Sequence, residues 1–458
     1  MKKKIALVCF SILLCITITI LNEYLRNDII PSGVFFCGVD VGGLSREEAE
    51  NKFKEIIENI MKKTLLLTFE NKRWIFRINE HIDIDEKKSI DNIFTYIKKD
   101  NLLQRYFLYQ RLKNSPVYFE PVIIFNEDYL KTTFDDINKE IMVEPVDASF
   151  KLENEILTIT NDINGRTIDE MELKREIVKA LYTDTKTILI PTKELRSNNS
   201  KEKLQSMGIE VKIAEYSTEF NKALKGRTEN IKLAAKKLNY HIIPHGQVFS
   251  FNEVVGERTK EKGYEEAAVF INNEVVNDIG GGVCQVSSTI YNLALLIDLE
   301  IIERTNHSLP VSYVPLGRDA TVNYNNIDLK FKNNTGGYLL LITEVIDDTL
   351  TAKFFGSKKQ YNYIELFSET IKTISPPVNI QKDNNLYKGE VKIKQGSNGY
   401  QVKLWKEYIN NRERGKKLIS EDVYNPTPTI IYVGEKTDNH NSEVEIVDKT
   451  TSSFEDNE

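Results

Sequence analysis

Apolar and polar positions recur along the chain with two different periods, which predicts a mixture of helices and strands. Between residues 46 and 61 the apolar side chains follow helical spacing behind Ser45, which has Glu48 three places on, the pattern of a capping box. The stretch "TLLLTFENKRWIFRI" that follows has the pattern of a β-hairpin with its turn at Glu70–Asn71. The folded part of the chain is therefore expected to begin as an α+β structure.

The next residues continue this mixed pattern. Residues 89–112 have helical spacing, and "DASFKLENEILTITNDINGRTIDEMELKREIVKAL" predicts two strands, a turn through Asn164–Gly165 and a helix begun by Asp169. The segment "KTILIP" predicts one more strand. We expect residues 27–195 to form one α+β domain, in which no catalytic constellation is visible.

The second half of the chain divides by composition. Residues 196–208 are polar and lack apolar periodicity, which predicts a linker. Residues 209–356 carry a second α+β pattern, residues 357–436 predict short β-strands with glycines at the turns, and the acidic residues 437–458 predict a disordered tail. The turn glycines are Gly389, Gly396, Gly399, Gly415 and Gly434.

The first residues have the pattern of a membrane segment. Three lysines, Lys2 to Lys4, precede an apolar or hydroxyl-bearing run from Ile5 to Leu21. Since ~17–25 such residues span a bilayer as a helix, residues 1–26 predict a cytoplasmic stub and a transmembrane signal-anchor. The lysines on the inner side place the rest of the chain outside the membrane. A cleaved export signal is the alternative, although no small-x-small cleavage site follows the run.

Composition and charge narrow the classes of partner. The 458 residues include 61 basic and 68 acidic side chains, a formal net charge of −7, which argues against a nucleic-acid partner. There is no paired Cys or His spacing of a zinc site, and no Lys–Ser/Thr follows the glycines of residues 280–282. We therefore expect neither a metal nor another cofactor.

Cysteine is rare in this sequence. Of the 4 cysteines, Cys9 and Cys15 lie in the predicted anchor, which leaves Cys37 and Cys284 in the exported part. One disulfide between these two is conceivable, but a disulfide framework is not. A lone exported thiol is a candidate for reactivity.

Cys284 stands in "GGGVCQVSSTIYNLALLIDLEIIER", which predicts a glycine turn, a helix and a strand. Helical spacing puts Val286, Ile290, Leu293 and Ile297 on one buried stripe and Cys284 in the first turn. The unpaired N–H groups and the dipole of that turn favour a thiolate, and the glycines allow backbone N–H groups to reach a developing oxyanion. Cys284 is therefore a candidate nucleophile. The alternative is a buried cysteine that packs as a small apolar side chain.

A cysteine nucleophile needs a base within hydrogen-bond reach. His307 follows the strand predicted after the Cys284 helix, and a strand that returns along a helix brings its end beside the N-terminus of that helix. We therefore rank His307 first, ahead of His245 and then His241. The expected orienting partner is Asp319 or a backbone carbonyl.

The region from about Tyr216 to Gly356 resembles the VanW domain family. His245 departs from the family pattern, which usually has proline there, and this weighs against His245 as the base. The resembling pieces occur in order with near-standard spacing, and they are "YSTEF", "GRTENIKLAA", "GQVFSFNEVVGERTKEKGYEEAAVF", "GGGVCQVSSTIYNLALL", "LEIIERTNHSLPVSYVPLGRDATV" and "DLKFKNNTGG".

This resemblance implies an L,D-transpeptidase, an enzyme that forms 3–3 cross-links between peptidoglycan stem peptides through a cysteine thioester. The implied partners are a donor tetrapeptide and an acceptor amine. Carried over to this sequence, Cys284 is the nucleophile, His307 the base and Asp319 a further catalytic residue. The resemblance also marks Arg258, Ser288 and Tyr313 as substrate-site candidates, to which Gly281 and Gly282 are added as donors of backbone N–H groups to the oxyanion.

Two flanking resemblances complete the domain order. Residues 27–195 resemble a peptidoglycan-binding domain family through "PSGVFFCGVDVGGLSREEA" and "VDASFKLENEILTITNDINGRTID", and residues 357–436 resemble a G5 domain. We therefore predict an α+β multidomain protein with an N-terminal membrane anchor helix, an α+β wall-binding-like domain, an α+β VanW domain (residues 209–356) and a small all-β G5-like domain.

Such a chain would be held at the cell membrane by a single pass, with its bulk extracellular and facing the cell wall. Two alternative functions stay open at this point. One is a non-catalytic scaffold that binds peptidoglycan, and the other is a cysteine peptidase that trims stem peptides.

Overall fold

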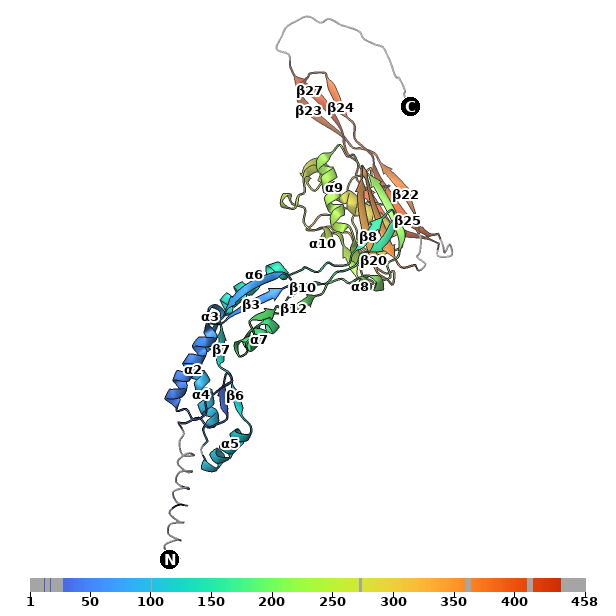
Figure 1. Cartoon of the computed structure of the whole chain (residues 1–458). Coiled ribbons are helices and arrows are strands. Elements are labelled where there is room, and N and C mark those ends of the chain that lie inside the picture. Colours follow the sequence, from blue (N-terminus) through green and yellow to red (C-terminus); the bar gives the residue numbers. More distant parts are fainter. Residues whose placement is uncertain are drawn as a thin grey trace, which may run out of the picture. The chain divides into compact units, whose positions relative to one another are not determined.

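The computed structural model describes residues 28–99, 101–271, 274–358, 364–409 and 415–437, together with Ile12 and Thr17 (Figure 1). No helix in this described part is long and apolar enough to cross a membrane. The anchor expected in residues 1–26 lies outside the described residues except for Ile12 and Thr17, and the expected tail lies outside them after Thr437. The described residues form two compact units, one of residues 28–148 and 161–200 and one of residues 149–160 and 201–437.

The first unit is α+β, as its sequence pattern predicts. Its helices are α2 (Arg46–Met61), α3 (Ile78–His81), α4 (Glu86–Ile97), α5 (Leu102–Asn114), α6 (Glu127–Ile141) and α7 (Glu170–Leu181). Its strands are β1 (Val34–Phe36), β2 (Val39–Asp40), β3 (Thr64–Phe69), β4 (Lys72–Arg77), β5 (Ile82–Asp85), β6 (Val117–Phe119), β7 (Val122–Phe125), β10 (Gly165–Ile168), β11 (Thr187–Leu189) and β12 (Thr192–Leu195). They form small sheets in the orders β2-β1-β6, β11-β3-β4, β5-β7 and β10-β12.

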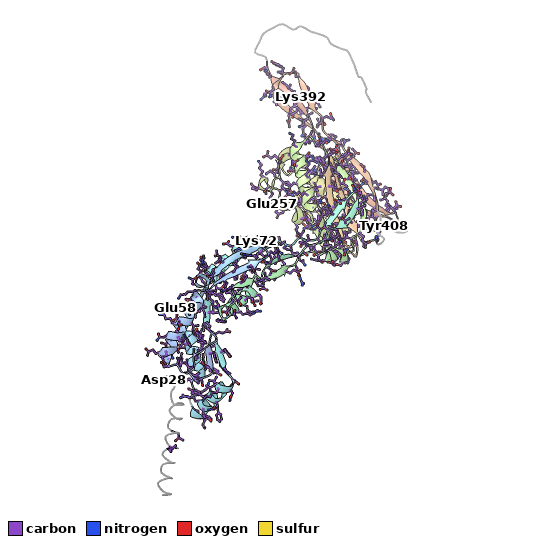
Figure 2. All side chains as sticks on the ribbon, viewed as in Figure 1. Asp28, Glu58, Lys72, Glu257, Lys392 and Tyr408 are labelled. Carbon is purple, nitrogen blue, oxygen red and sulfur yellow. The ribbon has the colours of Figure 1, made fainter. Side chains whose placement is uncertain are left out.

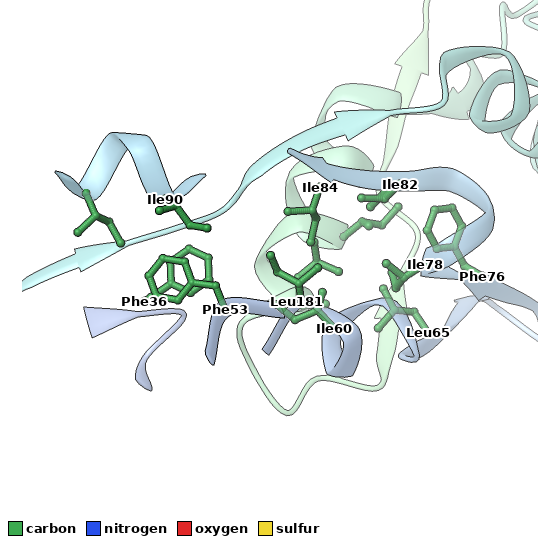
Figure 3. Close-up of a cluster of buried hydrophobic side chains, with 14 of the residues drawn as sticks. Phe36, Phe53, Ile60, Leu65, Phe76, Ile78, Ile82, Ile84, Ile90 and Leu181 are labelled. Carbon is green, nitrogen blue, oxygen red and sulfur yellow. The ribbon is translucent and has the colours of Figure 1, made fainter. Parts of the chain in front are cut away.

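Local signals in this unit act as the sequence predicts. Ser45 caps α2 with two reciprocal hydrogen bonds. The Glu48 amide donates to the Ser45 hydroxyl, and the Ser45 amide donates to the Glu48 carboxylate. The hairpin β3–β4 pairs Phe69 with Lys72 across the predicted turn. Buried side chains from α2, α7 and the strands form one apolar core, in which the rings of Phe36 and Phe53 stack 4.0 Å apart (Figure 3).

One local prediction about residues 161–208 is wrong, and another is incomplete. The turn expected at Asn164–Gly165 is absent from these described residues, because Gly165 opens β10 and pairs with Leu195. A Cβ at Gly165 would lie 2.0 Å from the Val143 carbonyl oxygen, so a close backbone approach requires this glycine. The expected linker also contains a helix, α8 (Lys201–Ser206), whose Leu204 is buried.

The second unit contains the region of Cys284. Its helices are α8, α9 (Lys225–Leu238), α10 (Phe251–Val255), α11 (Val283–Leu296) and the 3-10 turn η1 (Lys260–Lys262). Its first strands are β8 (Phe150–Glu153), β9 (Ile156–Ile159), β13 (Val211–Glu219), β14 (His241–Ile243), β15 (Val248–Ser250), β16 (Glu266–Ile271), β17 (Glu274–Ile279), β18 (Glu300–Glu303), β19 (Lys330–Lys332), β20 (Leu339–Ile346) and β21 (Thr349–Gly356). The main sheet has the order β13-β21-β20-β14, beside a three-stranded sheet β15-β19-β18 and the hairpins β16-β17 and β8-β9.

Helix α11 forms the centre of this unit. It packs against β13, β21 and α9, and α9 in turn packs against β20. The sequence predicted one buried stripe, and its members are buried, but the prediction was incomplete because polar residues such as Gln285 and Asn292 are buried as well. Their side chains are hydrogen-bonded, for example Asn292 Nδ2 to the Arg318 carbonyl at 2.7 Å. A helix covered on every side holds its N-terminus rigidly.

The remaining strands form two small sheets. They are β22 (Ile364–Ile374), β23 (Val378–Tyr387), β24 (Val391–Lys394), β25 (Gly399–Tyr408), β26 (Lys416–Tyr424) and β27 (Thr429–Lys436), in the orders β22-β25-β26 and β23-β27-β24. The all-β prediction is correct, but strands of 11 residues (β22) and 10 residues (β25) are longer than expected. Gly434 lies within β27 rather than in a turn. A Cβ at this position would lie 2.0 Å from the Tyr387 carbonyl oxygen, so the close approach of the two backbones requires glycine.

The sheet β22-β25-β26 shares its core with the region around α11. Leu404 of β25 is fully buried in the same apolar cluster as Val286 and Ile290. Figure 2 labels Tyr408 at the end of β25 and Lys392 on β24, one residue from each of the two sheets. The first of these sheets is thus part of the fold that surrounds Cys284.

Candidate active site

The glycine turn before α11 positions Cys284. Gly282 is the N-cap of the helix with φ +106°, and Gly280 has φ +85°, backbone conformations that favour glycine. A Cβ at Gly282 would lie 2.9 Å from Arg227 Cγ and 3.0 Å from Ile231 Cγ1. Cys284 therefore stands in the first turn of α11, as predicted, because the chain enters the helix through a turn that only glycine fits.

Replacement of Gly282 by alanine tests this turn. The left-handed backbone costs about 1–2 kcal/mol for a residue with a Cβ, and the overlap with Arg227 adds to that cost. We expect Gly282→Ala to lower the free energy of unfolding, measured by denaturant titration. Gly246→Ala is the matched control, since Gly246 also has a positive φ but nothing lies within 4 Å of its Cβ position. Equal stability of the two variants would contradict this account.

The thiol of Cys284 lies against the backbone of Val322. Its Sγ is 3.5 Å from both the amide nitrogen and the carbonyl oxygen of Val322. The side chain is half-buried, and it is also hydrogen-bonded to the His307 ring. Thus the helix N-terminus, one backbone amide and one imidazole surround the sulfur.

His307 is held by Asp319 through two bonds. The Asp319 Oδ2 atom lies 2.6 Å from His307 Nδ1 and accepts a second bond of 2.6 Å from the His307 backbone N–H. Both side chains are buried, with Asp319 fully so. Because Nδ1 faces the carboxylate, Nε2 is the ring nitrogen left for the thiol. Cys284, His307 and Asp319 therefore form one hydrogen-bonded row.

The electrostatics of this row favour a thiolate–imidazolium pair. Burial raises the pKa of the Cys284 thiol, but the hydrogen bond and charge of His307, with the Val322 amide and Arg258, bring that pKa below its usual value. Burial lowers the pKa of His307, but Asp319 and Cys284 outweigh it and raise the pKa to about 9. Burial also raises the pKa of Asp319, which His307 and Arg304 nevertheless hold below its ordinary value. The three groups thus support each other's charged forms.

The other predicted site residues lie around this row. Ser288 is fully buried, donates to the Cys284 carbonyl at 2.7 Å and accepts from the Ala320 amide at 2.9 Å. It therefore ties α11 to the segment that carries Asp319. The Tyr313 ring lies edge-on to the His307 ring, with centroids 6.5 Å apart, and the Tyr313 hydroxyl is hydrogen-bonded to Ser288.

Arg258 presents an unpaired donor near the thiol. Its Nη2 donates to Asn252 Oδ1 at 2.7 Å, whereas its buried Nη1 has no hydrogen-bond partner among the residues that the structure describes. Its positive charge interacts with Cys284. Because a buried unpaired guanidinium nitrogen is costly, this Nη1 is suited to a negatively charged group of a bound substrate.

Several backbone N–H groups at the turn are candidate donors to an oxyanion. The Val283 amide already donates to the Gly280 carbonyl at 3.1 Å. The remaining candidates are the amides of Gly281, Gly282 and Cys284 itself.

The other histidines of the described part do not join this site. His245 Nδ1 accepts from the Gly336 amide at 2.9 Å and is exposed, and His241 packs edge-on to Phe249. His81 is buried in the first unit, bonded to the Arg77 carbonyl and to Thr133. In the described chain no group of three or more His, Cys, Asp or Glu side chains is placed to hold a metal ion.

Sequence reasoning missed the groups that hold the other oxygen of Asp319. Its Oδ1 accepts a bond of 2.6 Å from the Tyr424 hydroxyl and lies 3.4 Å from Arg304 Nη2. Arg304 is the residue after β18, and its Nε also donates to the Asp319 carbonyl at 2.7 Å. No local pattern marks either residue, since both act through contacts formed only in the folded chain.

Together the fold and this row define an α+β domain with a cysteine, a histidine and an aspartate at the N-terminus of a buried helix. Comparison with known families places the domain more closely. Residues 226–355 match the family described as VanW like protein, residues 78–189 match "Putative peptidoglycan binding domain", and residues 368–436 match the G5 domain. The chain therefore carries these three domains in the order expected from the sequence, which supports a cell-wall-related function.

Two curated relatives are similar to this chain. "Uncharacterized protein YoaR" of Bacillus subtilis (strain 168) is 42% identical over 129 residues, which are 28% of this chain and 43% of the relative. "Vancomycin B-type resistance protein VanW" of Enterococcus faecalis (strain ATCC 700802 / V583) is 33% identical over 135 residues, 28% of this chain and 49% of the relative. The chain thus spans less than half the length of each of these relatives.

Two solved structures are also similar. "IgA1 Protease G5 domain structure" is 27% identical with a TM-score of 0.13, covering 18% of this chain and 100% of that one. "Crystal structure of HP0197-G5" is 20% identical with a TM-score of 0.11, covering 16% of this chain and 97% of that one. With TM-scores this low, neither similarity enters the argument below.

Proposed function

We propose that this protein is a peptidoglycan L,D-transpeptidase that forms 3–3 cross-links through a thioester on Cys284. The observation that supports the proposal most is the hydrogen-bonded row of Cys284, His307 and Asp319 at the N-terminus of α11. Such a row combines an activated nucleophile, a proton carrier and an orienting carboxylate. The VanW-like and peptidoglycan-binding matches support the cell-wall part of the proposal.

The first half of the reaction makes the thioester. The Cys284 thiolate attacks the carbonyl carbon of residue three of the donor tetrapeptide, and the oxyanion accepts bonds from backbone N–H groups of the glycine turn. The C–N bond to residue four then breaks, and the His307 imidazolium gives its proton to the departing amine. D-alanine leaves, and His307 is neutral.

The second half transfers the acyl group. The side-chain amine of a diamino acid on another stem attacks the thioester carbonyl, and neutral His307 takes the proton that this amine loses. The C–S bond breaks, an amide joins the two stems, and the thiolate–imidazolium pair is restored. The buried Arg258 Nη1 has no hydrogen-bond partner among the described residues, and the Arg258 charge interacts with Cys284. We therefore assign this nitrogen to a negatively charged group of the substrate, the oxyanion or the terminal carboxylate.

The order of the domains supports a location for this reaction between the cell membrane and the cell wall. We propose that residues 1–26 hold the chain at the cell membrane by a single pass and that the rest faces the wall. The peptidoglycan-binding match at residues 78–189 and the G5 match at residues 368–436 support contact with wall polymer.

The experiment that tests the function uses purified protein and disaccharide-tetrapeptide muropeptides, with products followed by mass spectrometry. We expect dimers joined by a 3–3 link and release of one D-alanine per link. Tripeptide monomers without dimers would instead show a hydrolase that delivers the thioester to water. Unchanged tetrapeptides that nevertheless bind the protein would show a scaffold, and either result would overturn the transpeptidase proposal.

The pH dependence of thioester formation follows from the pair of the Cys284 thiolate and the His307 imidazolium. The Cys284 pKa lies below its usual value and the His307 pKa is raised to about 9, so the pair persists between these two pKa values. The rate of D-alanine release is expected to rise as the thiol ionises and to fall as the pH rises through about 9, where the leaving amine loses its proton donor. Release that keeps increasing well above that pH would contradict the assigned role of His307.

A further inference from the structure

Strand β26 runs directly beside His307. The Nδ2 of Asn306 donates to the Val423 carbonyl at 3.0 Å, and the Asn425 amide donates to the Ser308 carbonyl at 2.7 Å. Both chain neighbours of His307 are thus bonded to the end of a strand more than 100 positions later in the sequence. The backbone that presents the imidazole is fixed by that strand.

Tyr424 of the same strand holds the carboxylate behind His307. Its hydroxyl donates to Asp319 Oδ1 at 2.6 Å and accepts from the Gly317 amide at 2.7 Å, and the side chain is fully buried. Burial and the neighbouring Asp319 charge raise the pKa of Tyr424, which keeps the phenol protonated. Tyr424 is therefore a fixed donor to the oxygen of Asp319 that His307 does not use.

Asp422, two positions earlier on the same face of β26, engages Arg304. The Arg304 Nη1 lies 2.6 Å from Asp422 Oδ1, whereas its Nη2 lies 3.4 Å from Asp319 Oδ1. The guanidinium also donates to the Asp319 carbonyl and to the Gly317 carbonyl. The buried Arg304 thus makes its shorter ion pair with Asp422 and its longer one with Asp319.

The loop that carries Asp319 rests on the neighbouring strand as well. Gly317 has φ +82°, and a Cβ there would lie 3.4 Å from Leu404 Cβ and 3.6 Å from Asp422 Oδ2. The sheet β22-β25-β26 is therefore packed against this loop at ordinary van der Waals distances.

We propose that Tyr424 and Asp422 are positioning residues of the Cys284 site, and that the sheet β22-β25-β26 is a structural part of that site. Both residues lie within the G5 match at residues 368–436 and outside the VanW match at residues 226–355. The inference rests on the proposed function only for the reaction that the site catalyses, because the ionisation of the Cys284 thiol can be measured without any substrate. It assigns the G5 segment a role in the chemistry besides any contact with wall polymer.

Titratable and charged groups from several elements surround His307 and its two direct partners, Asp319 and Cys284. They are Cys284 on α11, Arg258 after α10, Arg304 after β18, Tyr313 and Asp319 in the following loop, and Asp422 with Tyr424 on β26. Of these, Tyr424 and Asp422 act on His307 only through Asp319 and Arg304. Removing either one is expected to loosen the carboxylate and weaken the imidazolium, which in turn weakens the thiolate.

The test is the pH profile of alkylation of the Cys284 thiol by iodoacetamide in the full chain, with the modified peptide identified by mass spectrometry. In Tyr424→Phe, which keeps the ring and removes the hydroxyl, we expect the alkylation rate at neutral pH to fall about tenfold, since a bond to a charged group is lost. The apparent pKa of the thiol is expected to rise in the same variant.

Tyr408→Phe is the matched control. The Tyr408 hydroxyl donates to Asp298 Oδ2 at 3.0 Å, so this variant also removes a tyrosine–carboxylate bond between the G5 segment and the residues around α11. It leaves Asp319 untouched, and we expect the wild-type alkylation profile. A Tyr424→Phe profile that coincides with that of Tyr408→Phe would overturn the proposal.

Asp422→Asn is a second, independent variant. Arg304 would then have Asp319 as its remaining carboxylate among the partners described here, and would compete with His307 for it. The same direction of change is expected, and an unchanged profile would again count against the proposal. If the alkylation profiles shift while no variant, wild type included, makes cross-links, this inference holds and the transpeptidase proposal fails.

Discussion

Replacement of Cys284 by alanine is expected to abolish the formation of 3–3 linked dimers from tetrapeptide muropeptides. The loss should be on the order of 10⁵–10⁶-fold in rate, the scale found when the nucleophile of a catalytic triad is removed. The measurement is the rate of dimer appearance and of D-alanine release by mass spectrometry, with purified wild-type and variant protein.

The physical reason is that the covalent step requires the sulfur that is held beside His307. The Cys284 sulfur sits in the first turn of α11 with the Val322 amide 3.5 Å away and the His307 ring bonded to it. A methyl group in its place leaves the helix and the His307–Asp319 pair intact but offers no lone pair to the substrate carbonyl. The loss should therefore appear in kcat without a matching loss of stability.

Cys37→Ala is the control for this experiment. Cys37 is the other free thiol in the described chain and lies in the first unit, where burial and the neighbouring Glu120 raise its pKa to about 12. It is therefore not a thiolate near neutral pH, and its removal should leave the rate unchanged. Equal dimer formation by the Cys284→Ala variant and the wild type would contradict the assignment of the nucleophile.

The part of the site that is local in sequence could be predicted from the residues alone. Three glycines before a helix indicated a turn, which the structure forms at Gly280–Gly282, and helical spacing put Cys284 in the first turn of that helix. The order of helix and returning strand also selected His307 over His245, and the structure brings His307 to the thiol while His245 bonds to Gly336. These predictions depend on contacts within one helix–strand unit.

The part that depends on distant contacts could not be predicted. Tyr424 follows Asp319 by 105 positions, and its strand looked like any other exposed strand of an all-β module. Nothing in its alternation distinguishes Asp422 and Tyr424 as partners of a buried aspartate, since the same pattern serves any half-buried sheet. For the same reason the close approach at Gly165 was mistaken for a turn. Backbone contacts between separate segments leave no periodic signal.

Replacement of Asp319 by asparagine is the second variant with a large expected effect. The carboxylate Oδ2 accepts two bonds from His307, and Oδ1 accepts from Tyr424, so the native site needs an acceptor at both oxygens. An asparagine keeps the shape but turns one acceptor into an NH₂ donor, which then faces either the His307 N–H groups or the Arg304 guanidinium. In neither orientation of the asparagine amide can all the hydrogen bonds of the native row be made.

Asp319→Asn also removes the negative charge of the Asp319 carboxylate. Asp319 is a main reason that the His307 pKa lies at about 9 despite burial, which by itself would lower it. In Asp319→Asn the imidazolium is therefore less stable, the thiolate that it supports is less populated, and the alkaline fall in rate moves to lower pH. The loss in kcat should be on the order of 10³–10⁴-fold, as when the aspartate of a triad becomes asparagine.

Asp298→Asn separates this effect from the general loss of a partly buried, hydrogen-bonded carboxylate. Asp298 accepts from Tyr408 in the same unit and has φ +60°, a conformation that asparagine adopts readily. We expect it to retain the wild-type rate and pH profile, measured as D-alanine release across the pH range. An Asp319→Asn enzyme with at least about a tenth of the wild-type rate and an unmoved alkaline limb would mean that His307 does not depend on this carboxylate. In that case the role of the whole row, Tyr424 included, would have to be reassigned.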